Sequence, residues 1–145
     1  MRVNWRICLC RHLNLNRARG ENYTQEKSRL LFSQEFIDNN PDIMDVFIAD
    51  MLEYPTPPHG YQRQGEAVMG FNAYDRLPEI KVPTLVIAGT ADRLIPVENS
   101  RILASRIPNA ELVILENMGH GFTGEAPEEA NKAVLDFLGQ HCRSR

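Results

Sequence analysis

The pattern of apolar and polar residues is most regular in the second half of the chain, where strand and helix patterns alternate. Residues 82–89 form an apolar, β-branched run with a proline near its start and a glycine at its end, which is typical of a strand buried on both faces. Residues 111–115 form a second such run. A helix is predicted after Pro96, and a second amphipathic helix begins at Pro127 and is expected to end at Gly139. This order predicts parallel strands joined by a right-handed crossover.

The middle of the chain, residues 27–70, has helical periodicity and no strand pattern. Helices are predicted around Gln34–Asn39 and Pro41–Tyr54. The proline-rich run Tyr54–Gly60 then predicts a rigid turn or linker. We therefore expect a three-part organisation, with boundaries at 1–26, 27–70 and 71–145.

Charge is distributed unevenly along the chain. The net charge of the 145 residues is −3, but residues 1–20 contain five arginines and no acid, so this head carries +5 and the remainder −8. The head has no serine, unlike a transit peptide, and its apolar stretch Ile7–Cys10 is too short for a secretory signal. Because an acidic body repels phosphate, we expect no nucleic-acid partner.

Composition describes an ordinary globular chain. Its residues are 43% apolar and 24% charged, as expected for one domain that buries its own core. Three cysteines without paired spacing favour a reducing compartment, and we expect a cytoplasmic protein. Apolar runs fall short of the ~20 residues that cross a bilayer, so no membrane association is expected.

The candidate chemistry lies just after the two predicted strands. In open α/β sheets, reactive groups gather beyond the carboxyl ends of the strands, where Asp92 and His120 occur here. A carboxylate that accepts the imidazole Nδ1–H fixes the tautomer and leaves Nε2 to take a proton. Gly119 and Gly121 would let the histidine turn tightly and approach a substrate. The alternatives are a turn-forming aspartate and a surface histidine without a role.

These residues carry a family resemblance. Asp75–Asp92, Ile95–Asn99 and Gly119–Phe122 resemble the C-terminal part of α/β-hydrolase-fold proteins, most closely the esterase, enol-lactonase and haloperoxidase-like branch. Residues 27–70, including Leu30–Ser33, more weakly resemble the helical cap of those proteins. The resemblance implies an α/β fold with about three parallel strands, flanking helices and a helical cap segment.

By this resemblance, Asp92 would be the acid and His120 the base of a Ser-Asp-His triad. Leu94 and Phe122 are candidates for lining the substrate pocket, with core packing as the alternative. The implied substrate is a small apolar ester or lactone, and neither a cofactor nor a metal is expected.

The nucleophile of such a triad does not occur in these 145 residues. None of the serines lies in the G-x-S-x-G pattern that exposes a nucleophile, and no cysteine has the flanking glycines. Since removing a triad nucleophile costs about 10⁶ in turnover, we expect the chain to be inactive alone. Residues 2–10 faintly resemble the strand that follows the nucleophile helix, which suggests a truncated or misassigned beginning. An exposed sheet edge would then favour self-association or pairing with the missing half.

Three alternatives remain open from the sequence. Cys8, Cys10 and His12 alternate and could face a metal, although no fourth ligand accompanies them at zinc-site spacing. The chain could be a non-catalytic ligand-binding or interaction module with a hydrolase-like frame. It could also be a small hydrolase that uses water or an unrecognised nucleophile.

Overall fold

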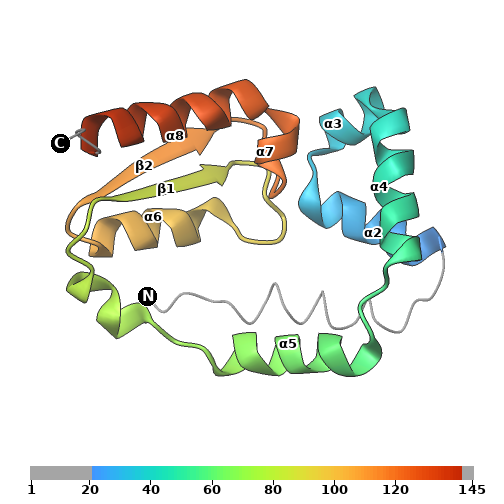
Figure 1. Ribbon diagram of the computed structural model, residues 1–145, viewed down its shortest axis with the longest axis horizontal. Coiled ribbons are helices and arrows are strands. Elements are labelled where there is room, and N and C mark those ends of the chain that lie inside the picture. Colours follow the sequence, from blue (N-terminus) through green and yellow to red (C-terminus); the bar gives the residue numbers. More distant parts are fainter. Residues whose placement is uncertain (1–20, 142–145) are drawn as a thin grey trace.

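Residues 71–141, which we call the strand-and-helix half, contain a small three-layer unit. The computed structural model describes residues 21–141, with side chains from residue 25 onward. Strands β1 (Thr84–Gly89) and β2 (Ala110–Leu115) are parallel and paired in register, from Thr84 opposite Ala110 to Gly89 opposite Leu115. Helix α6 (Val97–Arg106) covers one face of the strands and α8 (Pro127–His141) the other (Figure 1). The predicted strand, helix, strand, helix order is confirmed.

The core of this half follows from its apolar pattern. Val86 and Ala88 of β1 are buried, as are Ile107 after α6 and Ala130 on α8. Val86 and Ala88 point to the same face of β1. Helices cover both faces of the strands, because a two-stranded parallel sheet must be covered on both sides to keep its apolar residues from water.

Two predicted boundaries are wrong in detail. Helix α8 does not end at Gly139 but continues to His141, since Gly139 keeps a helical backbone and has open space around it. The predicted break at Tyr54–Gly60 is shorter than expected. Pro58 opens α5 (Pro58–Gly70), because a proline lacks an N–H that the first helical turn would leave unpaired.

Residues 21–70 are helical, as the pattern predicted for 27–70. Besides α5, they form α2 (Glu21–Leu31), α3 (Gln34–Asn39) and α4 (Pro41–Glu53). Phe32 follows α2, and its ring stacks on that of Phe36, with 5.5 Å between the ring centres, and forms a T-shaped contact with Phe47, with 5.0 Å between the centres. This aromatic cluster joins α2, α3 and α4, which lie beside the short helix α7 (Phe122–Glu125) in Figure 1. We call residues 21–70 the helical segment.

A two-turn 3₁₀ helix connects the helical segment to β1. This helix, η1 (Tyr74–Glu79), has no signal in the periodicity. The guanidinium of Arg106 lies 3.9 Å from the centre of the Tyr74 ring, and its Nε donates to the Tyr74 carbonyl at 3.2 Å. The end of α6 therefore holds η1 in place.

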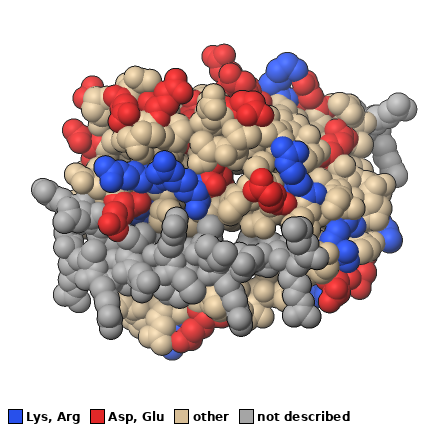
Figure 2. Space-filling view, turned by 180° about the vertical axis from the view of Figure 1, so that it is seen from behind, with Lys and Arg blue, Asp and Glu red and all other residues tan. Residues whose placement is uncertain are grey.

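Two predictions fall on residues outside the described part of the chain. They are the third strand at residues 2–10 and the metal alternative at Cys8, Cys10 and His12. Within residues 21–141, no cluster of three metal-binding side chains occurs and no helix is long and apolar enough to cross a membrane. On the face in Figure 2, acidic side chains of the described residues gather along the upper edge, and the basic side chains lie in separate groups that have acidic neighbours.

Candidate active site

Asp92 is placed by the turn that follows β1. Its Oδ1 accepts hydrogen bonds from the backbone N–H groups of Leu94 at 2.8 Å and Ile95 at 2.7 Å. The side chain is only 6% exposed. The turn-forming role is therefore present, but it occupies one carboxylate oxygen and leaves Oδ2 for another partner.

The loop after β2 is pressed against the loop after β1. A Cβ on Gly89 would lie 2.0 Å from the Met118 carbonyl oxygen, so only glycine permits this approach. Ala91 donates to the same carbonyl at 2.9 Å. Asn117, with φ of 62°, turns the chain through the left-handed region, and its N–H donates to the Thr90 hydroxyl at 2.8 Å. These contacts bring His120 to the end of β1.

His120 and Asp92 form a close pair, as the sequence predicted. The His120 Nδ1 lies 2.9 Å from Asp92 Oδ2, and the histidine side chain is 37% exposed. The hydrogen bond to Asp92 raises the pKa of His120 above 6.5; burial lowers it and the Asp92 charge raises it further. Because Nδ1 is engaged with the carboxylate, Nε2 is the nitrogen left for proton exchange.

An open groove of about 390 Å³ adjoins the pair along β1. Asp92 and His120 contribute to its wall, together with Phe122, Ile95 and residues of β1 and α6. Phe122 thus lies beside the pair, as a pocket residue would. Leu94 does not line this groove, and its recorded polar contact is the backbone bond to Asp92.

The glycines beside His120 allow a close contact with the helical segment that was not predicted from the sequence. A Cβ on Gly119 would lie 2.8 Å from the Leu31 carbonyl oxygen, and one on Gly121 would lie 2.7 Å from the Phe32 ring. Both positions face the turn between α2 and α3 in the helical segment. The glycines therefore allow another part of the chain to pack against the histidine loop.

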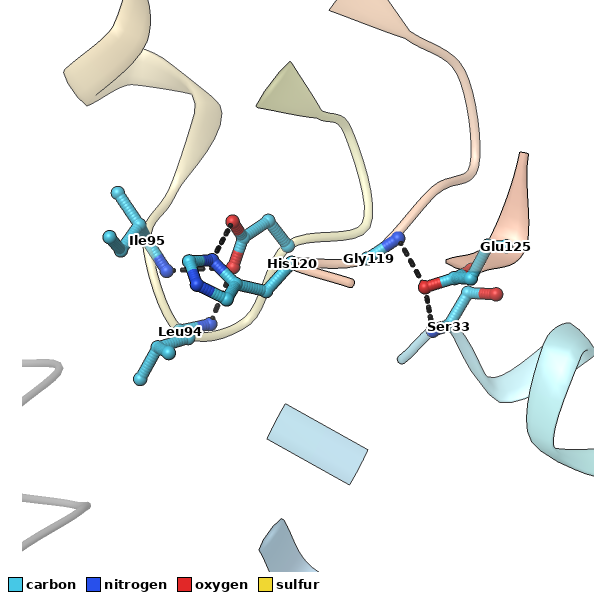
Figure 3. A network of polar contacts seen from close by, with 7 residues as sticks. Ser33, Leu94, Ile95, Gly119, His120 and Glu125 are labelled. Carbon is cyan, nitrogen blue, oxygen red and sulfur yellow. Dashed lines mark hydrogen bonds and ion pairs between the residues drawn. The ribbon is translucent and has the colours of Figure 1, made fainter. Parts of the chain in front are cut away.

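Two polar residues near the pair were missed. Glu125 Oε1 accepts hydrogen bonds from the backbone N–H groups of Ser33 at 3.1 Å and Gly119 at 3.0 Å (Figure 3). Ser33 also caps α3, since its Oγ accepts from the Phe36 N–H at 3.2 Å. A serine before a helix is a readable capping signal, but nothing in the pattern links it to Glu125, 92 residues away.

Parallel strands covered by helices on both faces, with the polar pair beyond their carboxyl ends, define the C-terminal part of an α/β-hydrolase fold. The family model described as TAP-like protein matches residues 57–141. The chain belongs to this family of α/β-hydrolases.

The chain is similar to hydrolases that act on different substrates. It is 33% identical over 120 residues to RutD of Stutzerimonas stutzeri, assigned as a carbamate hydrolase, covering 83% of this chain and 45% of RutD. It is 43% identical over 81 residues to a poly(3-hydroxyalkanoate) depolymerase of Ectopseudomonas oleovorans, covering 56% and 28%. The enol-lactonase of Burkholderia xenovorans superposes with a TM-score of 0.76 at 26% identity, covering 93% and 50%. The chain thus spans half or less of the length of these relatives.

Proposed function

We propose that this chain provides the acid–base half of a hydrolase that cleaves carboxylic ester or lactone bonds. The observation that carries the proposal is the 2.9 Å contact between His120 Nδ1 and the buried Asp92 carboxylate. Kinship with a lactonase and a depolymerase supports the reaction class. Residues 27–70 would act as the cap, and residues 71–141 would carry the acid and the base.

In this proposal His120 moves a proton twice. Its Nε2 takes the proton of a serine hydroxyl as the oxygen attacks the substrate carbonyl, and then gives that proton to the leaving alkoxide. In the second step Nε2 takes a proton from a water molecule as its oxygen attacks the acyl-enzyme, and then gives that proton to the serine oxygen, which releases the carboxylic acid and regenerates the serine. Asp92 stays ionised, holds the Nδ1–H tautomer and stabilises the imidazolium.

The serine and its oxyanion-binding groups would come from the part of a full-length hydrolase that these 145 residues do not include. No serine of this chain lies in a G-x-S-x-G pattern. We therefore propose that the chain has negligible turnover by itself and regains activity with that other part. Phe122 would contact the substrate from the groove wall.

Complementation tests this proposal. The chain is co-expressed with a hydrolase N-terminal half that carries a G-x-S-x-G serine, and hydrolysis of a p-nitrophenyl ester is measured. His120→Ala should abolish the recovered turnover, with a loss of about 10⁶, whereas His59→Ala, at an exposed histidine of α5, should leave it unchanged. Recovered activity that survives His120→Ala would contradict the proposal.

A second candidate is a ligand-binding module without turnover. The groove of about 390 Å³ favours it, since Phe122 and Ile95 give it an apolar lining beside the polar pair. A measurable affinity of the isolated chain for a short ester, with no hydrolysis after complementation, would support this candidate over the first.

A further inference from the structure

Glu125 has an unusual balance of contacts for a carboxylate. It lies in α7, a single turn of four residues, and its Oε1 accepts two hydrogen bonds. Its Oε2 is buried and has no hydrogen-bond partner among the described residues. Burying an unpaired carboxylate oxygen costs free energy. The two hydrogen bonds that Oε1 accepts are the contacts of this carboxylate that offset the cost.

Those two N–H groups belong to separate parts of the molecule. The Gly119 N–H directly precedes His120, whereas the Ser33 N–H lies in the helical segment, at the start of α3. Figure 3 shows Glu125 between the two, with His120 on the adjoining stretch of the loop. One carboxylate oxygen therefore bridges the helical segment and the backbone of Gly119, the residue before His120.

The other neighbour of His120 is held by the same turn. The Gly121 N–H donates to the Leu31 carbonyl at 2.6 Å, and Gly121 packs so closely on the Phe32 ring that a Cβ would lie 2.7 Å from it. The residues on both sides of His120 are thus fixed against residues 31–33. Because Phe32 also packs on Phe36 and Phe47, a shift of α3 or α4 would be passed to this turn.

We propose that Glu125 is a positioning residue that ties the helical segment to His120, so that the place of this segment sets the alignment of His120 with Asp92. This inference rests on the proposed role of His120 as the base. The helical segment then controls the alignment of His120 with Asp92, in addition to any contact that it makes with substrate.

Titration of His120 by NMR in the isolated chain tests this role without any turnover. Asp92 and burial cause the pKa shift of His120, so the shift reports directly on the alignment of the pair. Glu125→Ala and Glu125→Asp should each move the pKa toward 6.5, with about half or more of the wild-type elevation lost. Glu125→Asp keeps the charge, so a fall in that variant comes from lost reach rather than from lost charge.

The matched control is Glu129→Ala, which removes an exposed acid from the first turn of α8 and should leave the His120 pKa unchanged. A folded Glu125→Asp variant with the wild-type pKa would overturn the inference. A lower melting temperature with no change in this pKa would show that Glu125 is only structural. If complementation fails while the Glu125 variants lower the pKa, the positioning role stands and the proposed function falls.

Discussion

The strand-and-helix half and the helical segment bury their apolar residues to different extents. Residues 71–141 bury six apolar side chains, at Leu77, Val86, Ala88, Ile107, Ala126 and Ala130. Among residues 25–70, whose side chains the structure describes, two apolar side chains are buried, Met44 and Tyr61. Apolar side chains that are more than half exposed occur in both regions, such as Val46 and Tyr54 in the helical segment and Val82 before β1. The first region has a core of its own, whereas the second depends more on contacts at its border.

Because of this difference, the contacts that connect the two regions beside His120 are important for the site. We call these contacts the joint. Two hydrogen bonds, from Gly121 to Leu31 and from Ser33 to Glu125, connect them beside His120. A region with few buried side chains can move at low cost in free energy. Changes in the strand-and-helix half should therefore have the larger effects, and changes at the joint should reveal how strongly the helical segment is coupled to the site.

The largest expected effect concerns Asp92. In the complemented enzyme, Asp92→Asn should lower turnover about 10⁴-fold, because an amide facing Nδ1 favours the wrong histidine tautomer. Ile43→Ala, at a residue 52% exposed on α4, should change turnover by less than about threefold. Steady-state ester hydrolysis measures both. Similar losses in the two variants would remove the contrast between the regions.

Alanine substitutions at two glycines compare how strongly each region contributes to the free energy of unfolding. Gly89→Ala should lower the free energy of unfolding by on the order of 3 kcal/mol or more, since its Cβ would meet the Met118 carbonyl at 2.0 Å. Gly70→Ala, at the end of α5 with nothing within 4 Å of a Cβ, should be neutral or stabilising by up to about 1 kcal/mol. Urea unfolding gives both values. A tolerated alanine at position 89 would show that the two loops are not in close contact.

A double-mutant cycle measures the joint itself. Gly121→Ala should destabilise the chain by about 1–3 kcal/mol, because its Cβ would meet the Phe32 ring at 2.7 Å. Phe32→Ala should relieve this clash, which predicts a coupling free energy of about 0.5–2 kcal/mol between the two changes. Additive effects would mean that the ring does not pack on the histidine loop in solution.

The smallest effect is a pH dependence of stability. The folded-state pKa of His120 is raised above its unfolded value of 6.5, so the folded state binds the proton more tightly. Its contribution is therefore fully present below pH 6.5 and is lost as the pH rises through the folded pKa. Wild type should exceed His120→Ala in unfolding free energy by more at pH 5.5 than at pH 8.5. A constant difference would contradict the raised pKa.

The strands, the helices and the Asp92–His120 pair could be predicted from the sequence because the patterns that indicate them are short and local. The apolar run at residues 82–89, Pro96 before α6 and Pro127 at the start of α8 define these elements independently of the rest of the chain. The pairing of Asp92 with His120 followed from parallel strands that end at the same edge. Glu125 and Ser33 could not be found in this way, because their contact depends on how the helical segment docks. The actual role of Gly121 depends on the same docking.

The most direct test of the account is the pKa of His120 in wild type and in Asp92→Asn, measured by NMR titration, with His120→Ala used to assign the resonance. We expect a wild-type pKa of His120 above 6.5, because the Asp92 hydrogen bond and charge outweigh burial. In Asp92→Asn only burial remains, so the pKa should fall to 6.5 or below. Equal values in the two proteins would show that Asp92 and His120 are not an acid–base pair, and the proposed function would then have no chemical basis in this chain.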